Sequence, residues 1–279
     1  MKLALDCYEC LQGLIHQAAE LATQDNSLRR RATEEGMKIL KREFSHEQMS
    51  IVIATKIHEV VKEVTGNPDP YRLVKQREMA IARRLYSETR HQYKDDFEGY
   101  LKLATVANAI DFFREADLIV DDIRRPVTFT LDDSQQFEMR LKGASKVLYL
   151  ADNAGEIYFD LPLVKYMRQF ADVAYVVKSL PVQNDATWED VKRAGLQSEF
   201  GRVITTGTAT PGIIFSLASA EFKQEFASAE LIFAKGMGYY ESLTELPPEG
   251  RFFYCLMAKC KPVASSLNVP VNSYVAMLW

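Results

Sequence analysis

The spacing of apolar residues divides the chain into two parts. In the first part, apolar side chains recur every three or four positions, which is the spacing of one face of an α-helix. The clearest helix follows a capping pattern at residues 45–48 and ends at Gly66. An earlier apolar stripe runs from Leu3 to Leu21, and the polar residues 25–27 end that helix and begin another. The first part is therefore predicted to be helical.

The second part has the pattern of strands that alternate with helices. The loop at residues 67–70, Asn-Pro-Asp-Pro, first separates the early helices from two more helical segments, 71–93 and 97–115. Beyond these, we predict strands at 146–151, 174–177, 202–205, 231–234, 251–258 and 273–278, and helices at 156–170, 185–195 and 211–228. This alternation favours an α/β fold whose largely parallel sheet is covered on both faces. We expect a helical N-terminal region over residues 1–115 and an α/β domain over 116–279.

The composition indicates a folded protein with small partners. The chain has 279 residues, of which 47% are apolar, enough to bury a core in one large domain or two coupled ones. The net charge is −4 and there is no block of basic residues, so we expect no nucleic-acid partner. No apolar run reaches the roughly 18 to 20 residues that span a bilayer, and Asp6 interrupts any secretory apolar region. We expect a soluble, cytoplasmic protein with no membrane partner, and nothing in the sequence indicates its oligomeric state.

Polar residues follow four of the predicted strands at the point where each strand ends. In a sheet of this kind, ligands bind beyond the carboxyl ends of the strands, so we expect these residues to converge. They are Asp152, Asn153 and Glu156, then Lys178, Asn184 and Asp185, then Gly207 and Thr208, and last Lys235 and Gly236. Asp152-Asn153 before a glycine is also the pattern of a plain capped turn between strand and helix, and the sequence leaves both interpretations open.

Histidine is absent from the predicted α/β domain. All four histidines lie at or before His91, so a Ser-His-Asp triad or a histidine-rich zinc site would need residues from the helical region. Carboxylate and amide oxygens instead suit a hard ion such as Mg²⁺ or Mn²⁺, which can bridge to a substrate phosphate. We predict that Asp152, Asn153 and Asp185 hold this ion, while Lys235 and glycine N–H groups neutralise a phosphoryl group.

Cys7 and Cys10 have the C-x-x-C spacing of a zinc knuckle or a redox pair. Cys255 and Cys260 would complete a four-thiolate site if the two ends of the chain met. The same spacing places Cys7 and Cys10 on the apolar stripe of the first helix, which favours core packing over metal or redox chemistry. Nucleotide-binding signals are weak, because GTATPG at 207–212 lacks the Lys of a phosphate-binding loop.

As a set, the strand-end motifs resemble those of the family first catalogued as domain of unknown function 89. Its members are described as metal-dependent damage-control phosphatases. The segments that carry the resemblance are LADNAGEIYFD (150–160), KSLPVQNDAT (178–187), TTGTATPG (205–212) and AKGMGYYESL (234–243), with shorter matches at CYEC (7–10), DPY (69–71), VANAIDF (106–112) and MAKCKPVA (257–264). The resemblance covers nearly the whole chain. It implies a helical N-terminal region packed on a three-layer α/β/α, Rossmann-like domain.

The resemblance also implies roles for single residues. The family's metal ligands map to Asp152, Asn153 and Asp185, and Lys235 would contact phosphate. Asn108 and Asp111 would approach the same pocket from the helical side, although their spacing alone is merely helical. The chain departs from the family pattern in two places, Tyr239 where many relatives have Asn, and the segment 178–180. Changes there would alter which substrate the pocket accepts.

We therefore predict a phosphomonoesterase that hydrolyses a sugar phosphate or a damaged phosphometabolite with a metal-activated water. Lys178 and Lys235 would steady the phosphoryl group, and Glu156, Asn184, Gly207, Thr208 and Gly236 would line the substrate site. Co²⁺ or Ni²⁺ are further candidate metals. The absence of a D-x-D motif favours water over a covalent carboxylate nucleophile.

Two other functions fit the same residues. A carboxyl methyltransferase that uses S-adenosylmethionine, a role also proposed for relatives of the family, would need glycines and an acidic residue after the first strand. A non-catalytic protein would use the metal to bind a phosphorylated ligand, or the N-terminal cysteines to sense redox state.

Overall fold

The computed structural model describes residues 1–109 and 125–279, and within them the α/β part is built on a seven-stranded sheet. The strands are β1 (Phe129–Asp132), β2 (Lys146–Leu150), β3 (Asp172–Val177), β4 (Arg202–Thr205), β5 (Leu231–Lys235), β6 (Phe252–Met257) and β7 (Tyr274–Leu278). Their order across the sheet is β1-β7-β6-β5-β2-β3-β4, and neighbours are parallel except for β6 and β7. The prediction of a mostly parallel sheet in an α/β fold is confirmed.

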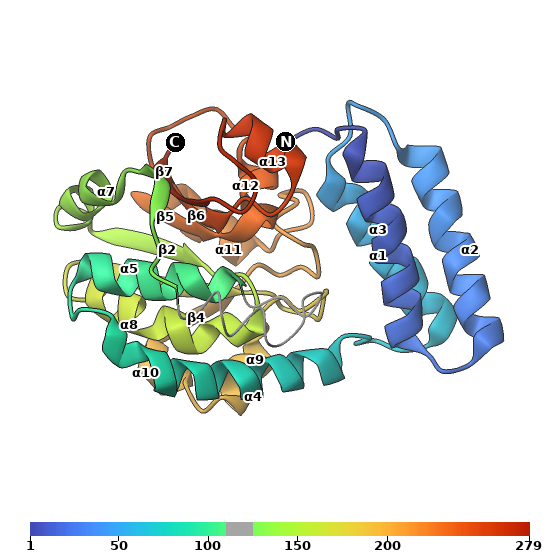
Figure 1. Cartoon of the computed structure of the whole chain (residues 1–279), viewed down its shortest axis with the longest axis horizontal. Helices are drawn as coiled ribbons and strands as arrows, with labels where there is room; N and C mark the ends of the chain where they lie inside the picture. Colours follow the sequence, from blue (N-terminus) through green and yellow to red (C-terminus); the bar gives the residue numbers. More distant parts are fainter. Residues whose placement is uncertain (110–124) are drawn as a thin grey trace.

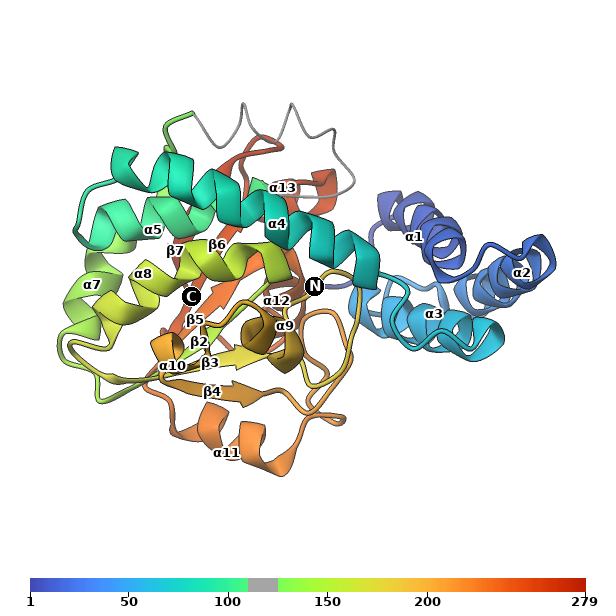
Figure 2. The same cartoon turned by 90° about the horizontal axis from the view of Figure 1, so that it is seen from below.

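Helices cover both faces of the sheet (Figure 1 and Figure 2). The helices of one face are α5 (Phe97–Val106), α7 (Ser134–Leu141) and α8 (Ile157–Met167), with α4 (Arg72–Thr89) outside them and the short α9 (Trp188–Arg193) and α10 (Gln197–Phe200) at the β4 side. The helices of the other face are α11 (Ala220–Ser228), α12 (Gly236–Leu243) and α13 (Lys261–Ser266). Side chains alternate along β2, so that Tyr149 packs on the first face and Leu148 on the second. The core is therefore two apolar layers on either side of one sheet.

The first three helices form a separate bundle beside the sheet layers (Figure 1). They are α1 (Asp6–Ala22), α2 (Asn26–Glu43) and α3 (Ser50–Thr65), and they bury their own apolar core. We call α1–α3 the helical unit. The loop before α4 joins the helical unit to the α/β part. Lys62 of α3 also donates to the carbonyl of Pro181, in the loop after β3. The predicted boundary at residues 115 and 116 lies outside the described residues.

Most predicted elements are present, and the exceptions have local causes. The capping pattern at 45–48 is wrong, because Met49 precedes α3 and makes no side-chain cap bond, whereas residues 45 and 48 form a backbone turn. Gly66 does end α3, with φ of 68°. Helix 211–228 is observed only from Ala220, after Ser219 caps it, because Gly212 adopts φ of 59°. The segment predicted at 97–115 is α5 followed by a short 3-10 turn, η2 (Ala107–Ala109), and the remainder lies outside the described residues.

Strand β1 was not predicted at all. It is four residues long, lies at the sheet edge and alternates between half-buried and exposed positions, so it lacks the apolar run of the central strands. None of the described helices combines the length and the apolar character that a membrane crossing would require.

Candidate active site

The candidate site lies where the direction of strand addition reverses. From β2 the chain adds β3 and β4 on one side, and it then returns to place β5 on the other side of β2. Two neighbouring strands whose connections leave in opposite directions open a crevice at their carboxyl ends, which is the usual ligand site of such sheets. Asp152 and Asn153 follow β2 at this point, and Lys235 with Gly236 ends β5.

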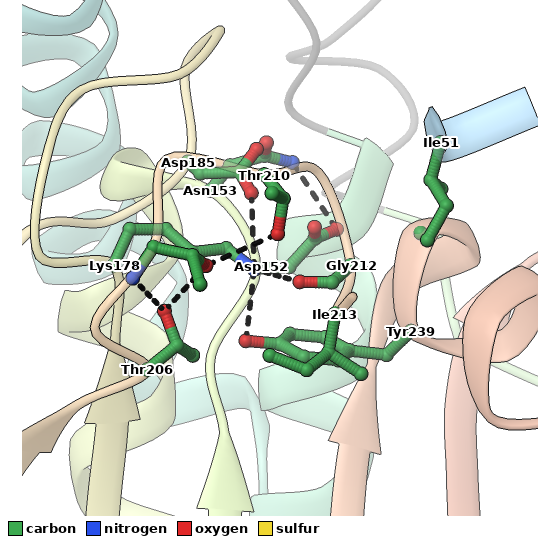
Figure 3. Close-up of polar contacts among 12 residues, drawn as sticks. Ile51, Asp152, Asn153, Lys178, Asp185, Thr206, Thr210, Gly212, Ile213 and Tyr239 are labelled. Carbon is green, nitrogen blue, oxygen red and sulfur yellow. Dashed lines mark hydrogen bonds and ion pairs between the residues drawn. The ribbon is translucent and has the colours of Figure 1, made fainter. Parts of the chain in front are cut away.

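The loops after β2 and β3 are joined by backbone hydrogen bonds. Asn153 and Asp185 form an isolated antiparallel bridge. The Ala186 N–H donates to the carbonyl of Asp152 at 2.8 Å, and the Ala154 N–H donates to the carbonyl of Asn184 at 2.8 Å. Figure 3 shows the side chains of Asp152, Asn153 and Asp185 gathered at this junction. The structure thus brings the three predicted metal ligands together.

Asn108 reaches the same point from η2, after α5. Its Nδ2 donates to Asp152 Oδ2 at 2.8 Å and to Glu156 Oε1 at 3.1 Å, while its Oδ1 accepts from the Met257 N–H at 3.0 Å. The side chain is only 1% exposed, so these bonds fix its orientation. The other residue implied from the helical side, Asp111, lies outside the described residues.

Gly236 allows Asp152 to lie against the end of β5. Its φ is 78°, and a Cβ at this position would be 2.0 Å from Asp152 Oδ2. Any other residue would displace the carboxylate, so glycine is required for the shape of the site.

The site carries more negative charge than its neighbours neutralise. Burial raises the pKa of Asp152 well above its usual range, and the carboxylates of Glu156 and Asp185 raise it further. Burial also raises the pKa of Asp185 to about 6, although the Lys178 ammonium opposes this shift. Carboxylates that are costly to ionise together are stabilised by a cation placed between them.

A divalent metal fits this set of donors. No group of three or more His, Cys, Asp and Glu side chains in residues 1–109 and 125–279 is arranged for a metal, and the predicted ligand set differs from such a group in that it includes the amide oxygen of Asn153. The Asn153 Nδ2 donates to Asp152 Oδ2 at 3.3 Å and to Glu156 Oε1 at 2.8 Å. Because both carboxylates occupy the amino group, the Asn153 oxygen is turned toward other partners. Two carboxylates, one amide oxygen and water are ligands that Mg²⁺ and Mn²⁺ accept.

Lys178 is a buried cation directly beside the predicted metal ligand Asp185. Its Nζ lies 3.6 Å from Asp185 Oδ2 and donates to the carbonyl of Gly212 and to the hydroxyl of Tyr239 at 3.0 Å. The ammonium also lies 4.2 Å from the centre of the Tyr239 ring (Figure 3). Burial alone would lower the pKa of Lys178, but Tyr239 and Asp185 raise it, so the lysine stays charged. Tyr239, one of the departures from the family pattern, is therefore a polar contact of this lysine.

Lys235, at the end of β5, is held by two other carboxylates. Its Nζ is 2.5 Å from Glu156 Oε2 and 2.5 Å from Asp160 Oδ1, and all three side chains are fully buried. Two carboxylates already neutralise this ammonium, so its contacts differ from those expected of a phosphate-binding lysine. The sequence motifs contain both Lys235 and Asp160, the latter as the last residue of LADNAGEIYFD and in the first turn of α8, but nothing in them indicated that the two side chains form an ion pair.

The remaining predicted residues border the site. Thr208 is 5% exposed and shares hydroxyl hydrogen bonds with Thr206 at 3.0 Å and Thr210 at 3.1 Å, within the loop after β4. Gly207 has φ of 77°, and a Cβ there would be 2.5 Å from the Ser219 side chain. The Asn184 side chain donates from Nδ2 to Glu78 of α4 at 3.2 Å.

Helix α4 holds the loop that carries Asp185. Glu78 accepts the hydrogen bond from Asn184, and Lys75 forms a buried ion pair with Asp190 at 2.7 Å. Asp190 also accepts from the Thr187 hydroxyl and forms the capping box of α9. The contacts of Glu78 and Lys75 join residues more than a hundred positions apart, and sequence spacing therefore missed them.

The predicted core packing holds in part for Cys7, which lies against the apolar core of the helical unit, and is wrong for Cys10. Cys7 is half-buried and Cys10 is exposed, because α1 buries Leu11, Ile15, Ala18, Ala19 and Ala22, a face rotated from the predicted stripe. Cys255 is buried beside the Thr105 hydroxyl at 3.0 Å, and all four thiols are unpaired. The zinc or redox role of Cys7 and Cys10 stays a prediction.

The chain is similar to known proteins over nearly its whole length. The model of the damage-control phosphatase ARMT1-like domain matches residues 3–275. A damage-control phosphatase of Pyrococcus horikoshii is 37% identical, over 99% of this chain and 98% of its own. One of Archaeoglobus fulgidus is 33% identical, over 99% of both chains. A crystal structure of a DUF89 family protein from Pyrococcus horikoshii superposes with a TM-score of 0.90 at 35% identity, covering 100% of this chain and 99% of that one.

Proposed function

The chain belongs to the damage-control phosphatase ARMT1-like domain family, and on that basis we propose a metal-dependent phosphomonoesterase acting on small phosphorylated metabolites at this sheet edge. The observation that carries the proposal is the pairing of two buried carboxylates, Asp152 and Asp185, whose pKa values are raised by burial and by neighbouring charge. A site that only capped a turn would need neither the second carboxylate nor the buried lysine beside it.

Asp152, Asn153 and Asp185 would hold the divalent metal, which we take to be Mg²⁺ or Mn²⁺, with Co²⁺ or Ni²⁺ as substitutes. When bound, such an ion withdraws charge from a phosphoryl oxygen and lowers the pKa of water. The oxygen-only donor set supports this choice over a soft metal.

The chain's own residues orient the reaction. Lys178 donates to a phosphoryl oxygen as charge develops there, and Tyr239 keeps the ammonium in place. The Gly207-Thr208 turn follows β4 at the same edge, and the Gly207 N–H would bind a second oxygen, since the Thr208 N–H already donates to the Thr206 hydroxyl at 3.3 Å. Water adds to phosphorus, the ester oxygen leaves with a proton, and the products are inorganic phosphate and an alcohol. Asp152 already accepts from Asn108 and Asn153, and this supports a ligand role over a nucleophilic one.

The test is phosphate release from a panel of sugar phosphates and damaged phosphometabolites with Mg²⁺, Mn²⁺, Co²⁺ and Ni²⁺. We expect EDTA to abolish activity and metal to restore it. Asp152→Ala and Asp185→Asn should each lower kcat/KM by about 10³-fold, because each removes a charge that acts at the reacting centre.

Asp172→Asn is the matched control. Asp172 lies at the opposite end of β3, its side chain is 60% exposed, and its ion pair is with Arg202. Full activity after chelation would contradict metal dependence, and full activity of both ligand variants would contradict the ligand assignment. Methyl transfer from S-adenosylmethionine without metal would revive the methyltransferase alternative, which the family does not favour.

A further inference from the structure

Asp160 is a buried carboxylate that the proposed reaction does not use. It is 0% exposed in α8 and accepts hydrogen bonds from the hydroxyls of Tyr149 and Tyr175, each at 2.8 Å. Its third partner is the Lys235 ammonium at 2.5 Å. The three partners come from β2, β3 and β5, so Asp160 joins the strands on both sides of the crevice.

Packing alone does not account for this group. Moving an Asp and a Lys out of water costs several kcal/mol per ion, and apolar residues of the same size are often as stable. Here Lys235 is shared between two carboxylates, Asp160 and Glu156, each 2.5 Å away. An ammonium that needed only one counter-ion would not require the second carboxylate or the two tyrosine donors beneath it.

The contacts continue from Lys235 to a metal ligand. Glu156 uses Oε2 for Lys235 and Oε1 to accept from Asn108 at 3.1 Å and Asn153 at 2.8 Å. A carboxylate can only accept, so it selects the amino end of the Asn153 side chain and turns the amide oxygen away from itself. The orientation of a metal ligand is thus set by the place at which Lys235 holds Glu156.

We propose that Asp160 is a positioning residue for the metal site: it holds Lys235 between two carboxylates, and Lys235 in turn holds Glu156 where it orients the amide of Asn153. Asp160 itself contacts none of the metal ligands. The inference rests on the proposed metal site, and it assigns Lys235 to the support of that site while Lys178 remains the cation that faces phosphate.

The experiment measures Mn²⁺ affinity directly, by the electron paramagnetic resonance signal of free Mn²⁺ and by calorimetry, in the full chain without substrate. Asp160→Asn keeps the shape of the side chain and removes its charge. We expect the Kd for Mn²⁺ to rise about 10- to 100-fold, the usual loss when a partner behind the ligands is removed. Tyr175→Phe leaves both charges and removes one donor, and we expect a rise of about two- to five-fold. Asp172→Asn, at the far end of β3, should bind as the wild type does.

A role in packing alone would lower the melting temperature of Asp160→Asn and leave its Kd unchanged. That result, in a folded variant with wild-type circular dichroism, would overturn the inference and leave the metal site standing. Absence of Mn²⁺ binding by the wild-type chain would overturn the proposed metal site and this inference with it. If Asp160→Asn does not fold, Tyr149→Phe/Tyr175→Phe decides, since an unchanged Kd in that double variant also overturns the inference.

Discussion

The helical unit and the sheet edge bury ionisable groups in opposite ways. In α3 of the helical unit, His58 is 2% exposed, its Nε2 has no hydrogen-bond partner among the described residues, and its ring packs edge-on against Tyr71. At the sheet edge, Lys178 and Lys235 are both 0% exposed and each lies within reach of a carboxylate. The helical unit keeps its buried histidine neutral, and the sheet edge keeps its buried lysines charged.

The difference shows where the chain can stabilise charge. Burial lowers the pKa of His58 to about 3, so near neutral pH the ring is uncharged and behaves as an apolar side chain. At the sheet edge, burial also opposes the charge of Lys178, but Tyr239 and Asp185 outweigh it. Charge is retained only where it has partners, and that is where an ionic substrate and a cation would bind.

Among the substitutions that test this difference between the two regions, removing the charge of Lys178 should have the largest effect on activity. Lys178→Met should lower kcat/KM by about 10²-fold, because a buried donor to the phosphoryl oxygens is lost while the metal ligands remain. Phosphate release at saturating Mn²⁺ measures it. Mn²⁺ affinity should not fall, since a positive charge near the ligands has been removed.

Lys192→Met is the matched control, because the Lys192 side chain is 45% exposed on α9 and its ion pair is local. If Lys178→Met kept kcat/KM within about threefold of the wild type, that residue would have no direct role in phosphate binding.

Much of the fold follows from local pattern, and the failures occur where the pattern is weak. The six predicted strands are all present, and the central ones are apolar runs with both faces covered, as in β5, which is buried at all five positions, whereas the edge strand β4 is mostly half-buried. Strand β1 has no such run. The stretch between β4 and α11 has apolar and polar residues at helical spacing, but positive φ at Gly212 and the hydroxyl bonds of Thr206, Thr208 and Thr210 favour a loop.

The site was partly predictable for a topological reason. Parallel strands bring their carboxyl ends to one edge, so Asp152, Asn153 and Asp185 could be grouped without knowing any contact. The partners of Lys235 could not, because Asp160 reaches it only through the packing of α8 on the sheet. Asn108 had no local signal either, and only the family resemblance pointed to it.

Tyr239 is a neutral hydrogen-bond partner of the buried Lys178 ammonium, and removing its hydroxyl should have a smaller effect than removing the lysine. Tyr239→Phe removes the hydroxyl that accepts from Lys178 at 3.0 Å but keeps the ring beneath the ammonium. A hydrogen bond to a charged group contributes about 1.5 to 3 kcal/mol, and because the ring and the Gly212 carbonyl still hold the ammonium we expect the lower end of this range, a fall in kcat/KM of about 10-fold. Phosphate release from the substrate panel measures this fall.

Comparing the loss of activity in Tyr239→Phe with that in Lys178→Met tests whether Tyr239 acts only by holding the lysine. A loss as large as that of Lys178→Met would mean that the hydroxyl itself contacts the reacting group. An unchanged rate would mean that Gly212 and Asp185 suffice to hold the lysine.

The smallest expected effect concerns His58, the neutral buried group of the helical unit. The unfolded chain protonates His58 near its ordinary pKa of 6.5, whereas burial keeps the folded pKa at about 3. The unfolded state therefore binds more protons between these values. The stability contributed by His58 is complete above pH 6.5 and is lost as pH falls toward 3. Between pH 7 and pH 5.5 this amounts to about 1 kcal/mol.

His58→Phe removes the titrating group and keeps a ring of similar size against Tyr71. The free energy of unfolding in urea, measured at both pH values, should fall less for this variant than for the wild type, by about 1 kcal/mol. His16→Phe, at an exposed position of α1, should behave as the wild type does. If His58→Phe and the wild type lost equal stability on acidification, the ring of His58 would have to be charged or solvated in the folded protein. The helical unit would then stabilise buried charge as the sheet edge does.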